Sequence, residues 1–126
     1  MLRLYHDPEG VEEVTEVNPD HFRKAVREGG TLEDITELYL LSDDEGLTYE
    51  NISIQAVGGE DTASESGHID ISYSLDGVAF NDPLELPDGD YTTAQKIYRK
   101  AVAPNVGAAF KRTDILHEWK FDEYVK

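Results

Sequence analysis

The side chains that most often act as catalysts or metal ligands are scattered along this sequence. The four histidines are His6, His21, His68 and His117, and their spacing matches no common metal motif. Cysteine is absent, which excludes disulfides, thiolate metal sites and cysteine nucleophiles. The sequence also lacks a nucleophile elbow, a zinc-protease motif, a phosphate-binding loop and a dinucleotide fingerprint. We therefore expect no catalytic residues, no metal and no cofactor, and a protein that is not an enzyme.

Carboxylates are so frequent that two close together say little about acid–base catalysis. Two acidic turns, Asp43-Asp44-Glu45 and Asp88-Gly89-Asp90, offer oxygen ligands for a hard cation such as calcium, but neither has the ligand spacing of an EF-hand. Solvated turns are the simpler interpretation, and the sequence leaves cation binding open. His117 alternates with apolar residues, which is typical of a packed histidine in a core or an interface.

The charge balance is strongly acidic, with 27 Asp and Glu against 11 Lys and Arg and a formal net charge of −16. The acidic residues are spread through the chain, which is typical of a folded domain with an acidic surface. Such self-repulsion is tolerable when salt near 1 M shortens the Debye length to about 3 Å. The composition favours a protein adapted to high salt, with an ordinary acidic bacterial protein as the alternative. A net acidic surface disfavours nucleic-acid binding.

One short region departs from this balance. Five of the eleven basic residues lie between positions 96 and 112, around the small apolar segment 104–110. These charges have two interpretations, which are neutralisation of nearby acids in the same molecule and a docking patch for the acidic surface of a partner. For the second interpretation, the expected interface residues are Lys96, Arg99, Lys100, Phe110, Lys111 and Arg112.

Apolar alternation and turn residues predict one domain over residues 1–126. Strands are expected at 2–5, 13–17, 35–41, 49–57, 68–75, 78–80, 96–103 and 113–125. Asn18 as N-cap and Pro19 as first helical residue predict one short inserted α-helix, at about residues 19–28. The expected fold is mostly β, an antiparallel sandwich or barrel. No apolar run reaches the roughly 18–20 residues of a membrane span, and the first residues lack a signal-peptide pattern.

Three segments, 38–44 (LYLLSDD), 49–54 (YENISI) and 97–105 (IYRKAVAPN), resemble the strand-and-turn pattern of small β-sandwich virion structural proteins of tailed viruses. The resemblance covers roughly residues 30–125. The chain departs from that pattern in its expected N-terminal helix, in its charge, and in Ser42-Asp43 where Asn-Asp is common. The resemblance implies a subunit that assembles with other virion proteins and with copies of itself, as a homo-oligomer in a symmetric particle.

Taken with the acidic composition, the resemblance implies a virus of halophilic archaea, with a subunit assembled in the host cytoplasm and located in the virion. Its place in the capsid, neck, tail or baseplate stays open. Neither nucleic acid nor membrane is an expected partner. The alternative is a β-sandwich that binds carbohydrate or a cell surface, with Tyr91, Trp119 and Tyr124 as aromatic residues that would stack on sugar rings.

Overall fold

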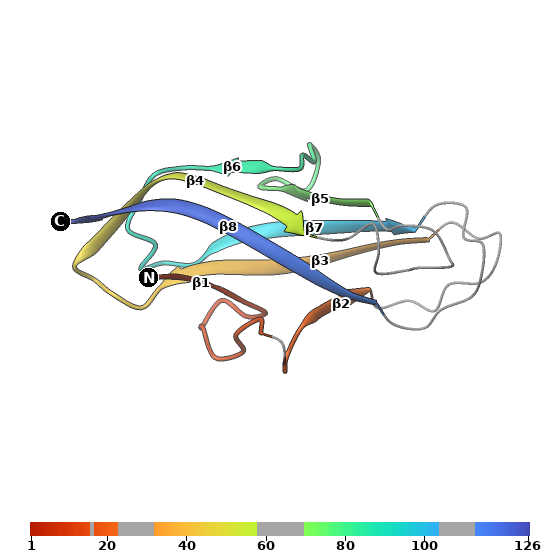
Figure 1. The fold of residues 1–126 in the computed structure, drawn as a ribbon, viewed down its shortest axis with the longest axis horizontal. Coiled ribbons are helices and arrows are strands. Elements are labelled where there is room, and N and C mark those ends of the chain that lie inside the picture. Colours follow the sequence, from red (N-terminus) through yellow and green to blue (C-terminus); the bar gives the residue numbers. More distant parts are fainter. Residues whose placement is uncertain (16, 23–31, 58–69, 104–112) are drawn as a thin grey trace.

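A computed structural model describes residues 1–15, 17–22, 32–57, 70–103 and 113–126 of the chain. Within these residues the protein is built of β-strands. They are β1 (Leu2–Tyr5), β2 (Asp20–Phe22), β3 (Leu32–Ser42), β4 (Leu47–Val57), β5 (Asp70–Ser74), β6 (Leu84–Leu86), β7 (Gln95–Ala103) and β8 (Thr113–Val125). The long strands follow the long axis of the molecule, and both termini lie at the same end (Figure 1). The described residues contain no helix long and apolar enough to cross a membrane.

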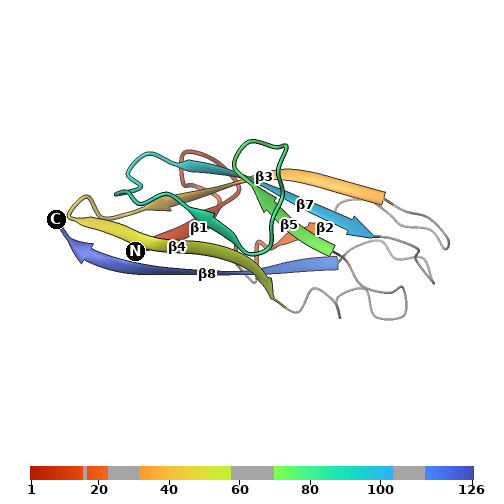
Figure 2. The same cartoon turned by 90° about the horizontal axis from the view of Figure 1, so that it is seen from above.

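The strands form two antiparallel sheets. The first sheet has the order β1-β3-β7-β5 and the second β2-β8-β4-β6. Figure 2 shows β4 and β8 side by side in one layer, with β3 and β7 in the other. The expected mostly-β fold with antiparallel sheets is therefore confirmed, and the packing of the two layers is that of a sandwich.

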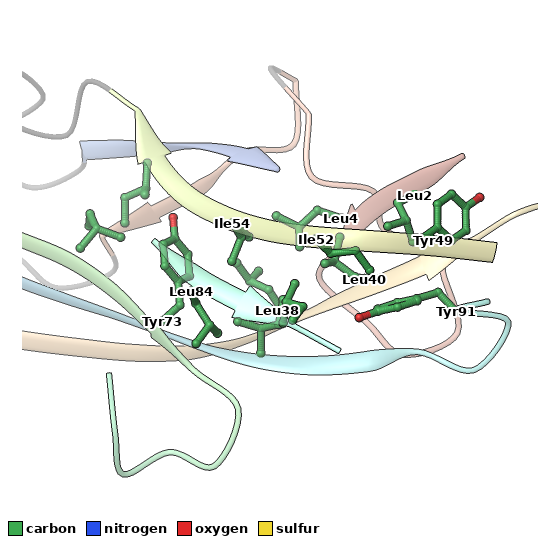
Figure 3. Close-up of a cluster of buried hydrophobic side chains, with 14 of the residues drawn as sticks. Leu2, Leu4, Leu38, Leu40, Tyr49, Ile52, Ile54, Tyr73, Leu84 and Tyr91 are labelled. Atoms are coloured by element: carbon green, nitrogen blue, oxygen red, sulfur yellow. The ribbon is translucent and has the colours of Figure 1, made fainter. Parts of the chain in front are cut away.

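Alternating apolar residues from both sheets fill the space between the layers. Leu38 and Leu40 of β3 face Ile52 and Ile54 of β4, and none of the four is more than 2% exposed (Figure 3). Tyr49 closes one end of this core, where its ring packs edge-on against Phe121 at 5.4 Å. Its hydroxyl lies 2.8 Å from the Ser42 hydroxyl, so its polar end is satisfied inside the core.

The start of the predicted helix is wrong. Asp20–Phe22 is strand β2, which pairs antiparallel with Ile115, Asp114 and Thr113 of β8. Asn18 and Pro19 favour a helix start only as a local preference. Pairing with β8 overrides this preference, and the Asp20 side chain lies buried in the interior. The rest of the predicted helix lies outside the described residues.

Other boundaries also differ from the expectation. The region 13–17 contributes only the single bridge Tyr5–Glu13 among the described residues, and 78–80 is not a strand. Strand β6 lies in a region where no strand was expected. A turn does form at Asp76-Gly77, where Asp76 accepts hydrogen bonds from the backbone N–H groups of Val78 and Ala79. Those backbone hydrogen bonds, together with one from the Ser74 hydroxyl, lower the pKa of Asp76 to about 2.

Candidate functional site

The most unusual feature of the interior is a buried polar cluster, made of Asp20, Asp34, Tyr73, Arg99 and His117. Asp34, Tyr73 and Arg99 come from β3, β5 and β7 of the first sheet. Asp20 and His117 come from β2 and β8 of the second sheet. The cluster therefore crosses the sandwich and joins the two sheets through side chains.

Arg99 is the centre of this cluster and is 0% exposed. Its guanidinium binds the Asp20 carboxylate through two hydrogen bonds, Nε to Oδ2 at 2.8 Å and Nη2 to Oδ1 at 2.7 Å. It also donates from Nη1 to the backbone carbonyl of Asp34 at 2.9 Å. The planar guanidinium suits this paired geometry, which a lysine ammonium cannot reproduce.

His117 connects the same carboxylate to Tyr73. Its Nε2 lies 2.8 Å from Asp20 Oδ2, and its Nδ1 lies 2.6 Å from the Tyr73 hydroxyl. Because an ionised carboxylate only accepts hydrogen bonds, Nε2 carries the proton of this contact. In the neutral imidazole Nδ1 is then an acceptor, and the Tyr73 hydroxyl donates to it.

The cluster shifts the ionisation of its members. Burial by itself would raise the pKa of Asp20, but hydrogen bonds from His117 and Arg99 and the guanidinium charge outweigh burial and hold that pKa well below its usual range. Burial, together with nearby Asp82 and Asp20, raises the pKa of Tyr73 well above its ordinary value. Asp20 is therefore a carboxylate and Tyr73 a neutral hydroxyl at neutral pH.

The order carboxylate, imidazole, hydroxyl is also that of a hydrolase triad. Here the Asp20 and His117 side chains are 0% and 1% exposed, and Tyr73 is 0% exposed. A nucleophile in a triad must meet its substrate, and this hydroxyl is enclosed between the sheets. The arrangement instead fixes the position of β2 and β8 relative to the first sheet.

Removing the Tyr73 hydroxyl tests how much the hydrogen bond to His117 contributes to the stability of the fold. In Tyr73→Phe the His117 Nδ1 stays buried without its partner, and we expect a loss of about 1–3 kcal/mol in the free energy of unfolding, measured by urea titration at pH 7. Tyr39→Phe is the matched control, because that hydroxyl bonds the exposed carboxylate of Glu37. Its expected change is within about 0.5 kcal/mol, and an equal loss in both variants would contradict the assignment.

The predicted interface residues separate in the structure. The inclusion of Arg99 in a docking patch is wrong, because its side chain points inward and is fully buried. Lys96 and Lys100 do lie on one surface, the outer face of the first sheet, where they are opposite Tyr39 and Ile35 of β3. Phe110, Lys111 and Arg112 lie outside the described residues.

We call the surface formed by Lys96, Lys100, Ile35, Tyr39 and Tyr98 the lysine face. Lys100 Nζ lies 4.3 Å from the centre of the Phe80 ring, and Lys96 Nζ lies 5.0 Å from that of Tyr98. Lys96 also lies 3.8 Å from the Glu37 carboxylate, so part of its charge is neutralised within the molecule. Ile35 is 48% exposed between these groups.

The outer face of the second sheet is more uniformly acidic. Its outward side chains include Glu50, Glu85, Glu118 and Asp122, all exposed, with Lys120 among them. We call this the carboxylate face. One molecule therefore presents a partly apolar surface of mixed charge on one side, where Lys96 and Lys100 lie among the exposed carboxylates of Glu33 and Glu37, and a mainly acidic surface on the other.

Two adjoining pockets open beside β8, with volumes of ≈ 260 and ≈ 500 Å³. Both are lined by Val14 and Trp119. The smaller pocket extends to Pro19 and Ile115, and the larger one to Phe121 and β1. Ile115, Trp119 and Phe121 lie on one side of β8, as strand alternation requires, but alternation gives no indication of the pockets.

The residues proposed for sugar stacking do not form a common platform. Tyr91 is 6% exposed and its hydroxyl donates to the Pro87 carbonyl. Trp119 is half-buried and donates its indole N–H to the Leu2 carbonyl. Tyr124 is the exposed member of the three.

The acidic turns use their carboxylates within the chain. Asp43 pairs with the Met1 amino group, and Asp44 accepts the Gly46 N–H. Asp88 accepts the Asn51 N–H, and Asp90 pairs with Lys126. Over the part of the chain that the structure describes, no cluster of three or more potential metal ligands occurs.

Comparisons with protein-family models, curated proteins and solved structures give no match to this chain. Its function must therefore be argued from its surfaces and its composition.

Proposed function

We propose that this chain is a virion structural subunit of a halophilic tailed virus and that it assembles with other copies and other virion proteins through the lysine face. The observation that carries the proposal is the difference in charge between the two outer faces, of which one carries two lysines beside Glu33 and Glu37 and the other is mainly acidic. Lys96 and Lys100 stand with exposed Ile35 on one sheet, while exposed carboxylates cover the other.

Complementary surfaces of this kind favour head-to-tail association. A lysine face that packs on a carboxylate face leaves a free face of each kind, so such contacts build rings when they close and filaments when they do not. Opposite potentials set the orientation, and the apolar groups contribute through the surface that they bury. Rings and filaments are both forms that a subunit of a symmetric particle can adopt.

The acidic composition supports the halophilic part of the proposal. At a net charge of −16 two copies repel one another at low salt. In molar salt the Debye length falls to about 3 Å, so repulsion over longer distances is screened while contacts at closer range persist. We therefore expect association to increase with salt.

Cross-linking mass spectrometry of purified particles of a virus that encodes this chain tests the proposal. We expect the chain in the particles, with cross-links from Lys96 and Lys100 to carboxylates of neighbouring molecules. Lys120 is the internal control, because its side chain is 69% exposed but lies on the carboxylate face. Absence of the chain from the particles would contradict the virion assignment, while cross-links from Lys120 alone would refute the docking face.

Charge reversal gives the matching solution experiment. In molar salt we expect the double variant Lys96→Glu, Lys100→Glu to lose at least about tenfold in association constant, which is about 1.4 kcal/mol. Sedimentation velocity measures this change. Lys120→Glu adds the same kind of charge on the other face and is expected to retain association. Equal behaviour of the two proteins would show that the lysine face does not direct assembly.

A further inference from the structure

Strand β8 is covered unequally by its neighbours. It is 13 residues long, and β4 pairs with it from Leu116 to Val125. On its other side β2 pairs only with Thr113 to Ile115, which Figure 1 shows as a short contact at the start of β8. Among the described residues, no strand pairs with that second side beyond Ile115. An open strand edge is a template for another strand.

The hydrogen bonds of β4 identify the backbone groups at this edge. Tyr49 exchanges two backbone hydrogen bonds with Gly89, and the Ala56 N–H points to Asp82, so both residues direct their backbone away from β8. Their partners on β8 are Glu123 and His117. In an antiparallel ladder such partners direct their own N–H and C=O away from the shared neighbour, here away from β4 and toward the open edge. By alternation, the backbone groups of Trp119 and Phe121 between them point to the open edge as well.

The same alternate residues line the pockets beside β8. His117 and Trp119 contribute to the smaller pocket, and Trp119 and Phe121 to the larger one. A strand added at the open edge would place its inward side chains beside these residues, since hydrogen-bonded partners share a face of the sheet. The side chains of such a strand can therefore enter the two pockets on either side of Trp119.

The opposite layer already extends under this position. Val14 donates its backbone N–H to the Leu4 carbonyl, and Glu13 bridges Tyr5, so this segment lies along β1 as an extra edge of the first sheet. One added strand would pack over Glu13 and Val14 as β8 packs over β1. If two copies paired through their β8 edges, the segment around Glu13 and Val14 of each copy would have to occupy the same space. The space therefore fits a single extended segment better than a second domain.

We propose that the open edge of β8 binds an extended segment of a partner protein, which adds as a strand beside residues 117–123. The segment carries apolar side chains at alternate positions, directed into the pockets, and basic side chains between them. Basic residues are favoured because the chain carries a net charge of −16 and Glu118 and Asp122 stand on the outward side of β8. This site is separate from the lysine face, so either proposal can fail without the other.

The first test concerns the free protein. Amide protons of Trp119 and Phe121 are expected to exchange with solvent much faster than those of Lys120 and Asp122, which face β4. Amide hydrogen exchange followed by NMR measures this alternation. Equal protection of all four amides would mean that the edge is already covered, and the proposal would be wrong.

The second test uses a capped ten-residue peptide of alternating lysine and valine. We expect saturable binding with a Kd below about 100 μM, a shift in the emission of Trp119, the single tryptophan, and new protection of the Trp119 and Phe121 amides. The matched peptide with N-methyl groups on its pairing amides is expected to bind at least about tenfold more weakly.

A pair of variants controls the protein side. In Glu123→Pro the edge loses one donor while the ladder to β4 stays intact, because the Glu123 N–H points away from β4. Glu123→Ala removes the same carboxylate and keeps that donor. We expect at least about tenfold weaker peptide binding for the proline variant than for the alanine variant. No saturable binding, equal binding of both peptides, equal binding by both variants, or a dimer through β8 would each overturn the proposal.

Discussion

Arg99→Ala is expected to lower the free energy of unfolding by about 3–5 kcal/mol, because it leaves the Asp20 carboxylate buried without its main countercharge. Asp20 is 0% exposed and receives two of its hydrogen bonds from this guanidinium. Since domains are stable by about 5–15 kcal/mol, such a loss can remove most of the margin. Urea unfolding at pH 7, followed by circular dichroism, measures it.

Two further variants separate charge from geometry. Arg99→Lys keeps the positive charge but not the paired donors, so we expect it to recover only part of the loss. Lys100→Ala, the next residue on β7, points to the outer surface and is expected to change stability by less than about 1 kcal/mol. If Arg99→Ala proved as mild as Lys100→Ala, the buried polar cluster would not hold the sheets together.

The second large effect is expected at Asp20 and depends on pH. Asp20→Asn keeps the shape of the side chain but removes the charge that Arg99 and His117 face, and we expect it to cost about 3–5 kcal/mol at pH 7. The pKa of Asp20 is lower in the folded protein than its ordinary value of 3.8. Its ionisation therefore contributes stability that is fully present above about pH 4.

That contribution is lost as the pH falls from about 4 through the folded pKa, because the folded state must then take up a proton that the unfolded state already holds. The difference in unfolding free energy between the wild type and Asp20→Asn is expected to shrink below pH 4. The other carboxylates, Asp76 among them, titrate in both proteins, so their contributions to stability cancel in this difference. A difference that does not change down to pH 2 would contradict the pairing.

Much of the fold follows from local pattern. In the middle of 113–125, from Glu118 to Asp122, apolar and polar residues alternate, and the bounds of β8 agree with the expectation. The burial of Ile71 and Tyr73 also follows from alternation. Strand β6 has three residues and lies between prolines, so it has no pattern of its own and exists through its pairing with β4.

The site could be predicted only in part. Arg99 lies on the same side of its strand as Ile97 and Ala101, while Lys96 and Lys100 lie on the other, so strict alternation already places Arg99 inside. The closeness of these basic residues in the sequence does not distinguish inward Arg99 from outward Lys96 and Lys100. The partner of Arg99 had no local signal, because Asp20 is 79 residues away and one of 27 acidic residues.

The pairing of Asp20 with Arg99 also constrains how this protein can diverge. A change at either position alone leaves a buried charge uncompensated, whereas replacing both by apolar residues of similar volume is often neutral or stabilising. The two positions should therefore covary among homologues, with Asp–Arg exchanged as a unit for an apolar pair. His117 would follow them, since without the carboxylate at position 20 its Nε2 proton has no acceptor in this cluster.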